Sequence, residues 1–73
     1  MSVVKVITII GESPESFAKA ADNAVRTAQK TIRNITGVDV ISMSATVDEN
    51  PGGIKEYRTT VNVAFVVESP GDD

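Results

Sequence analysis

The segment from Ile54 to Val67 alternates between apolar and polar side chains, and this pattern predicts one long β-strand. Its fourteen residues would extend roughly 45 Å at about 3.3 Å per residue, longer than a compact domain of 73 residues requires. One face carries Tyr57, Val61, Val63, Phe65 and Val67, and the other carries Glu56, Arg58, Thr60, Asn62 and Ala64. The rest of the fold must therefore be arranged along this strand.

Two further segments predict strands. Val3 to Ile10 is rich in β-branched residues and is followed by Gly11, which predicts a strand that ends in a turn. Alternation predicts another strand from Val38 to Val47, with Val38, Val40, Ser42, Ser44 and Thr46 on one face and Asp39, Ile41, Met43, Ala45 and Val47 on the other. The polar segment from Asp48 to Gly53, with its proline and glycines, predicts a hairpin turn into the long strand.

One helix is predicted between the first two strands. We expect Ser13 to cap its amino end, Pro14 to occupy its first turn and the helix to end near Arg33. The apolar residues recur every three or four positions and form one stripe: Phe17, Ala21, Ala24, Ala28, Ile32 and Ile35. Alanines at Ala20, Ala21, Ala24 and Ala28 make the helix slim, so that a sheet can approach its backbone closely.

The predicted fold class is α+β, with a β-α-β-β subunit whose three-stranded antiparallel sheet wraps on one helix. We expect one domain over residues 1–68, with the long strand in the middle, and a disordered acidic tail over residues 69–73. The sheet face away from the helix would carry small polar groups, namely Ser42, Ser44, Thr46, Arg58, Thr60 and Asn62. Such a face could be solvated, or it could receive a second molecule or a small ligand.

Size and charge limit the partners. Area scaling gives about 60% of the surface hidden on folding, which is a thin margin for a chain without cysteine or histidine and favours association with further copies. Seven basic residues against ten acidic ones give a net charge of −3, which argues against duplex nucleic acid as a partner. No apolar run reaches the roughly 20 residues needed to span a bilayer, and with no signal-peptide pattern at the start we expect a cytoplasmic protein without a membrane partner.

Catalytic groups are scarce in this sequence. Without histidine or cysteine, and with no carboxylate pair placed in a predicted pocket, the chain is expected not to be an enzyme. Tyr57 is expected to be a core residue, and Gly52-Gly53 to be a hairpin turn with no role in phosphate binding. The acidic turn from Asp48 to Asn50 offers oxygen ligands for calcium, although its spacing matches no EF-hand loop.

Three segments together suggest a family: VVKVITIIGESPESFAKAADNAV at the start, TIRNITGVDV at the helix end and IKEYRTTVNVAFVVE in the closing strand. They resemble the dodecins over essentially the whole chain to Glu68. The resemblance implies a hollow homododecamer, and many members of the family store flavins in pairs at subunit interfaces. It therefore implies riboflavin or flavin mononucleotide (FMN) as the class of ligand.

The sequence departs from the flavin-binding pattern at two positions. Those dodecins carry a stacking tryptophan shortly after the helix, where this chain has Gly37-Val38-Asp39, and an edge glutamine where this chain has Arg58. Losing the aromatic platform should weaken flavin binding, and a guanidinium cannot accept a hydrogen bond. By resemblance the cofactor-binding residues are Gly37, Val38, Asp39, Ser44 and Arg58.

Three alternatives remain open from the residues. The pattern without tryptophan looks like a branch that includes calcium-associated dodecins, although no metal ligands can be named. Arg58 could grip the phosphate of a nucleotide or of coenzyme A, or could pair with Glu56 or Asp39 of a neighbouring subunit. The assembly could also be purely structural.

Overall fold

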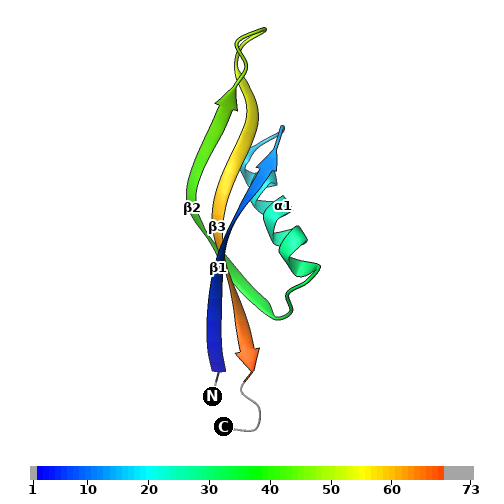
Figure 1. Cartoon of the computed structure of the whole chain (residues 1–73), viewed down its shortest axis with the longest axis vertical. Coiled ribbons are helices and arrows are strands. Elements are labelled where there is room, and N and C mark those ends of the chain that lie inside the picture. Colours follow the sequence, from blue (N-terminus) through cyan, green and yellow to red (C-terminus); the bar gives the residue numbers. More distant parts are fainter. Residues whose placement is uncertain (1, 69–73) are drawn as a thin grey trace.

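The computed structural model describes residues 2–68 and has the predicted β-α-β-β order. The elements are β1 (Ser2–Ser13), α1 (Phe17–Gln29), β2 (Ile35–Val47) and β3 (Ile54–Glu68) (Figure 1). The acidic tail expected over residues 69–73 lies outside the described residues.

The three strands form one antiparallel sheet in the order β1-β3-β2, so the long strand is central as predicted. β1 pairs with β3 from Ser13↔Tyr57 to Ser2↔Glu68, and β2 pairs with β3 from Val47↔Ile54 to Ile35↔Phe65. The helix covers only the middle of this ribbon, since the β2–β3 hairpin extends beyond one end of α1 and the β1–β3 pair beyond the other (Figure 1). The Cα atoms accordingly span 58 × 20 × 12 Å.

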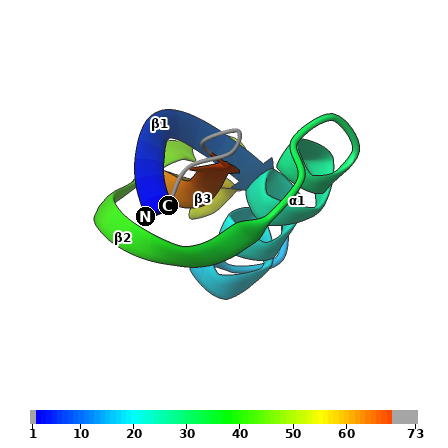
Figure 2. The same cartoon turned by 90° about the horizontal axis from the view of Figure 1, so that it is seen from below.

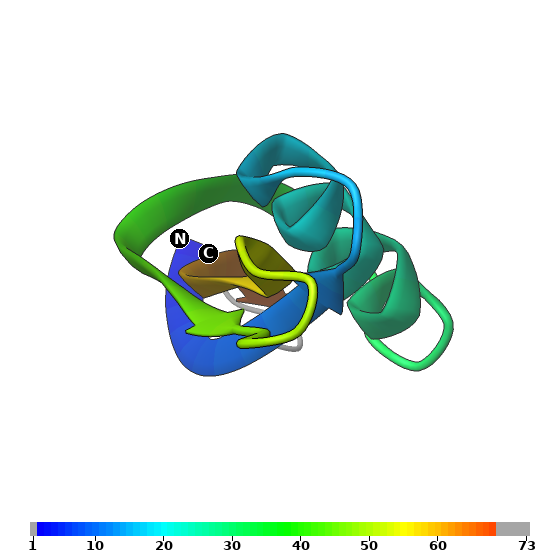
Figure 3. The same ribbon diagram turned by 90° about the horizontal axis from the view of Figure 1, so that it is seen from above.

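The sheet is strongly twisted, and α1 lies against one side of it (Figures 2 and 3). The core consists of Val61 and Val63 of β3 and Ala24 of α1, with Ile7 and Ile9 packed against them. Strand β1 therefore presents its odd-numbered residues to the helix, a choice that the sequence left open. Ala20, Ala24 and Ala28 are buried, as expected for a slim helix, whereas Ala21 packs half-buried at the side of the stripe.

Gly11 does not end β1 as predicted, because the strand continues to Ser13. This glycine lies directly under the helix, where an added Cβ would overlap the carbonyl oxygen of Ala20 and approach the Ala24 Cβ to 2.9 Å. It permits close contact between strand and helix and does not form a turn.

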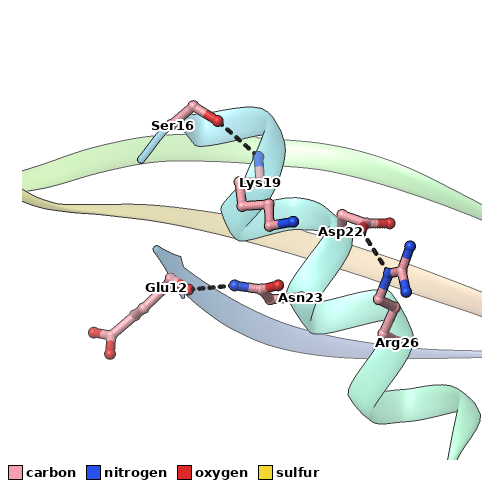
Figure 4. A network of polar contacts seen from close by, with 6 residues as sticks. All are labelled: Glu12, Ser16, Lys19, Asp22, Asn23 and Arg26. Atoms are coloured by element: carbon pink, nitrogen blue, oxygen red, sulfur yellow. Dashed lines mark hydrogen bonds and ion pairs between the residues drawn. The ribbon is translucent and has the colours of Figure 1, made fainter. Parts of the chain in front are cut away.

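The helix boundaries also differ from the prediction. Ser16, not Ser13, is the amino-terminal cap, and its Oγ accepts a hydrogen bond from the Lys19 N–H at 3.0 Å (Figure 4). The Ser13 Oγ instead accepts from the Glu15 N–H at 2.9 Å in the preceding turn. The helix ends at Gln29 and not near Arg33, and Asn34 adopts a left-handed conformation with φ of 63° where the chain turns into β2. Ile32 and Ile35, expected on the helical stripe, thus lie beyond the helix.

Strand β2 contains a bulge that the sequence pattern did not reveal. Val40 lies opposite Val61, but Ser42 lies opposite Thr60, so Ile41 is an extra residue in the ladder. Residues directly opposite one another share a face, so Val38 and Val40 lie on the helix side, whereas Ser42, Ser44 and Thr46 lie on the other. The prediction that all five share one face is therefore wrong.

Candidate functional site

The sheet face that points away from α1 holds most of the polar side chains singled out from the sequence. We call it the open face, and the strand register assigns to it Thr8 and Glu12 of β1, Arg58, Thr60 and Asn62 of β3, and Asp39, Ser42 and Ser44 of β2. Since β3 is central, each of its polar residues has one neighbour on β1 and one on β2.

Arg58 lies at the centre of the upper row of the open face. Its Nε is 3.1 Å from Oε2 of Glu12 on β1, and Ser44 lies opposite it on β2. The Nε atom is buried and has no well-aligned hydrogen bond, while the side chain as a whole is 42% exposed and that of Glu12 is 54% exposed. In this chain Arg58 thus pairs with Glu12 of its own sheet, a residue that the sequence analysis did not consider. The exposed part of the guanidinium keeps donors available for a ligand.

A second polar row crosses the open face four residues further along β3. The Thr8 Oγ1 donates to the Asn62 Oδ1 at 2.6 Å, and Asp39 lies opposite Asn62 on β2. The row therefore places a hydroxyl, an amide and a carboxylate on neighbouring strands. Oxygen groups of this kind are the ligands that calcium prefers.

The apolar side of the open face lies along β1. Val4, Val6 and Ile10 share the face with Thr8 and Glu12, and each is 54% exposed. The open face is therefore divided lengthwise into an apolar half on β1 and a polar half on β2, with Arg58, Thr60 and Asn62 between them.

The structure brings only some of the predicted site residues together. Ser44 is the direct neighbour of Arg58, and Asp39 and Gly37 lie on the same face further along β2, opposite Asn62 and Ala64. Val38 lies opposite Val63 on the helix face and is separated from the other four. A side chain added at Gly37 would meet no atom within 4 Å, so the position where flavin-binding dodecins carry tryptophan is open.

The remaining candidate groups have structural surroundings. Tyr57 packs edge-on against Phe17, with ring centroids 4.9 Å apart, as expected for a core tyrosine. Oδ1 of Asp48 accepts from the Asn50 N–H at 3.2 Å, and the Asp48 N–H donates to the Gly53 carbonyl at 2.9 Å, so this acidic segment closes the hairpin turn. Within residues 2–68 no three acidic side chains gather into a metal-binding group, and the described helix is too short and too polar to cross a membrane.

Comparison with known proteins identifies relatives along nearly the whole chain. The Dodecin family model matches residues 3–68. Calcium dodecin from Mycobacterium tuberculosis is 42% identical over 65 residues, or 89% of each chain. Dodecin from Thermus thermophilus is 32% identical over 66 residues, covering 90% of this chain and 93% of the relative.

The solved structures of both relatives have the same fold. A variant of the T. thermophilus dodecin superposes with a TM-score of 0.88 at 30% identity, covering 94% of this chain and all of the other, 100%. The M. tuberculosis protein, a calcium-chelating antigen with a novel calcium-binding site, superposes with a TM-score of 0.78 at 38% identity over 97% of both chains. With the family model, the sequence relatives and the topology in agreement, this chain belongs to the dodecin family.

Proposed function

We propose that this chain is a non-catalytic, self-assembling protein that holds a flat heteroaromatic ligand of the flavin class, riboflavin or FMN, on its open face. The observation that carries the proposal is the lengthwise division of that face into an apolar half with Val4, Val6 and Ile10 and a polar half with Ser42 and Ser44. An isoalloxazine ring has the same division, since its benzenoid end is apolar and its pyrimidine edge carries carbonyl and amide groups.

Arg58 is the residue best placed to select such a ligand. Its exposed guanidinium nitrogens can donate to a ring carbonyl or to the phosphate of FMN, and Ser44 beside it can donate or accept. The partial neutralisation of Arg58 by Glu12 favours a neutral carbonyl over a strongly charged group. Without an aromatic platform at Gly37, we expect binding to be weaker than in dodecins that carry the tryptophan.

Self-assembly is proposed because the isolated chain is too extended and too apolar for a monomer. It exposes 5169 Å², against about 4,300 Å² for a compact monomer of this mass. Its radius of gyration is 15.6 Å, against about 11 Å for a compact domain of this length. The excess area is close to the roughly 800 Å² that each partner buries in a standard interface. The family resemblance suggests twelve subunits, with the open face lying against or near a neighbour.

Calcium is the second candidate ligand, favoured by the row of Thr8, Asn62 and Asp39 on the open face. This row is incomplete by itself, because calcium takes six to eight oxygen ligands, roughly, and would need waters or oxygens from a neighbouring subunit. The higher identity to the calcium dodecin than to the T. thermophilus dodecin points in the same direction.

One titration series separates these candidates. Riboflavin and FMN fluorescence is followed as purified chain is added, and the melting temperature is measured with calcium and, separately, with each flavin. Quenching together with stabilisation by flavin supports the flavin proposal, whereas stabilisation by calcium alone supports the second candidate. Unchanged fluorescence at micromolar chain, with no thermal shift from flavin, would overturn the flavin proposal.

A further inference from the structure

A groove of about 530 Å³ runs between β1 and α1, away from the open face. Its lining is mostly apolar and includes Ile7, Ile9 and Ile10 of β1 and Ala24, Thr27 and Ala28 of α1. Nothing in the proposed ligand site uses this groove. Its position beside the outermost strand makes it a candidate surface for another chain.

The groove runs along an unpaired strand edge. β1 is the outer strand of the sheet, and no other strand within residues 2–68 pairs with its far side. The Asn23 Nδ2 donates to the Glu12 carbonyl at 2.9 Å, so this carbonyl points away from β3 and toward the helix (Figure 4). Peptide groups alternate in direction along a strand, so those of Ile10 and Thr8 also point outward, along the groove. Asn23 thus closes only one end of an edge that could accept another strand.

The opposite edge of the sheet has the complementary property. Val38 and Val40 lie on the helix side of β2, but α1 lies beside β1, and these side chains remain 43% and 55% exposed (Figure 1). Ile41 and Met43 are exposed as well. Apolar residues on both faces are typical of a strand covered on both sides, which β2 is not within one chain.

We propose that the β1 edge receives strand β2 of a second copy, with Val38 and Val40 of that copy packed into the groove against Ala24, Thr27 and Ala28. The regular stretch of β2 between its bulges, Gly37 to Val40, is the segment that would pair with β1. A second β1 would not fit, because it would bring its own helix into the same space, whereas no helix lies outside β2 (Figures 2 and 3). This inference rests on the proposed self-assembly and specifies one of its contacts.

Pairing of β1 with β2 is head-to-tail, so it uses two different surfaces and leaves one of each free on every added copy. Such contacts close into a ring when the rotation between copies allows it. All helices would then lie on one side of a continuous sheet and all open faces on the other. The contact therefore also determines which side of the assembly presents the ligand face.

A charge exchange tests this contact. Thr27→Glu and Val40→Lys should each weaken association at least about tenfold by burying an unpaired charge, as measured by sedimentation velocity over a concentration series. The double variant Thr27→Glu/Val40→Lys should restore association, because the two charges then meet between copies. Gln29→Glu, outside the groove on the same helix, is the matched control: it should assemble normally, and it should not rescue Val40→Lys.

Cross-linking provides a second measurement if the charged variants do not fold. The chain has no cysteine, so Thr27→Cys and Val40→Cys can be refolded together and treated with a short bismaleimide. The mixture should give a two-chain product containing both variants, and neither variant alone should give one. A product from Val40→Cys alone, or a Thr27→Glu variant that assembles like Gln29→Glu, would overturn the inference while leaving self-assembly intact. A monomeric parent chain would instead overturn the proposed self-assembly.

Discussion

Gly11 of β1 lies so close to Ala20 of α1 that a Cβ atom at position 11 would overlap the Ala20 carbonyl oxygen. The neighbouring atom belongs to helix backbone, which cannot move aside as the end of a flexible side chain can. The packing of α1 on the sheet therefore depends on the absence of a side chain at this position. Ala20 and Ala24 are the matching small residues on the helix.

Gly11→Ala should consequently destabilise the fold by about 1–3 kcal/mol through overpacking. For a chain of this size each kcal/mol lowers the melting temperature by about 4–8 °C, which calorimetry at fixed chain concentration will detect. Gly37→Ala is the control, since nothing lies within 4 Å of its added Cβ. Equal melting temperatures for the two variants would contradict the close approach described here.

Gly37→Trp tests the position of the ligand on the open face. Adding an aromatic platform to the open space at Gly37 should tighten riboflavin binding by about tenfold, because stacking adds about 0.5–1.5 kcal/mol beyond the area it buries. The measurement is fluorescence quenching of riboflavin. Val47→Trp, on the same strand near the hairpin turn, is the control and should leave the affinity unchanged. A Gly37→Trp variant that assembles but binds no more tightly than the control would mean that the ligand lies elsewhere.

Glu12→Gln tests the role of the ion pair across β1 and β3. Exposed pairs contribute about 0–1 kcal/mol, so stability should change little. Arg58 would lose its neutralising partner, and FMN binding should strengthen a few-fold relative to riboflavin because only FMN carries a phosphate. Arg58→Ala should remove the difference between the two flavins. If Glu12→Gln leaves the ratio of the two affinities unchanged, Arg58 does not contact the phosphate.

Ser16→Ala should lower the stability of α1 by about 1 kcal/mol, because the Lys19 N–H loses its capping acceptor. Ser16→Asp should retain the parent melting temperature, since aspartate is an equally good cap. Thermal unfolding followed by circular dichroism gives both values. A loss of stability in Ser16→Asp equal to that in Ser16→Ala would show that the cap is not the source of the effect.

The fold followed from the sequence where the pattern was local. Alternation from Ile54 onward identified β3, and the small residues of the helix indicated close packing on a sheet. Gly11 was misinterpreted because glycine serves both in turns and in close contacts, and only the position of α1 distinguishes the two. The bulge at Ile41 depends on the pairing of β2 with β3, which alternation along one strand cannot reveal.

The candidate site was predicted in part for the same reason. Ser44 and Arg58 were both assigned to the polar face and lie side by side. Val38 was grouped with them by position in the chain, but the strand register assigns it to the helix face. Glu12 was missed because β1 was expected to stop at Ile10. Continuing the period-two pattern through Gly11 would have placed Glu12 beside Arg58.

The pairing of Ser2 with Glu68 brings the first and last described residues onto neighbouring strands, about 5 Å apart. A linker of a few residues would therefore join these positions without disturbing the sheet, and new ends could be opened between Asp48 and Gly53 without cutting a strand. A circular permutant of this kind should keep the fold. Any peptide fused at either end would leave every subunit at the same pole, so an assembly would display its fused cargo in clusters.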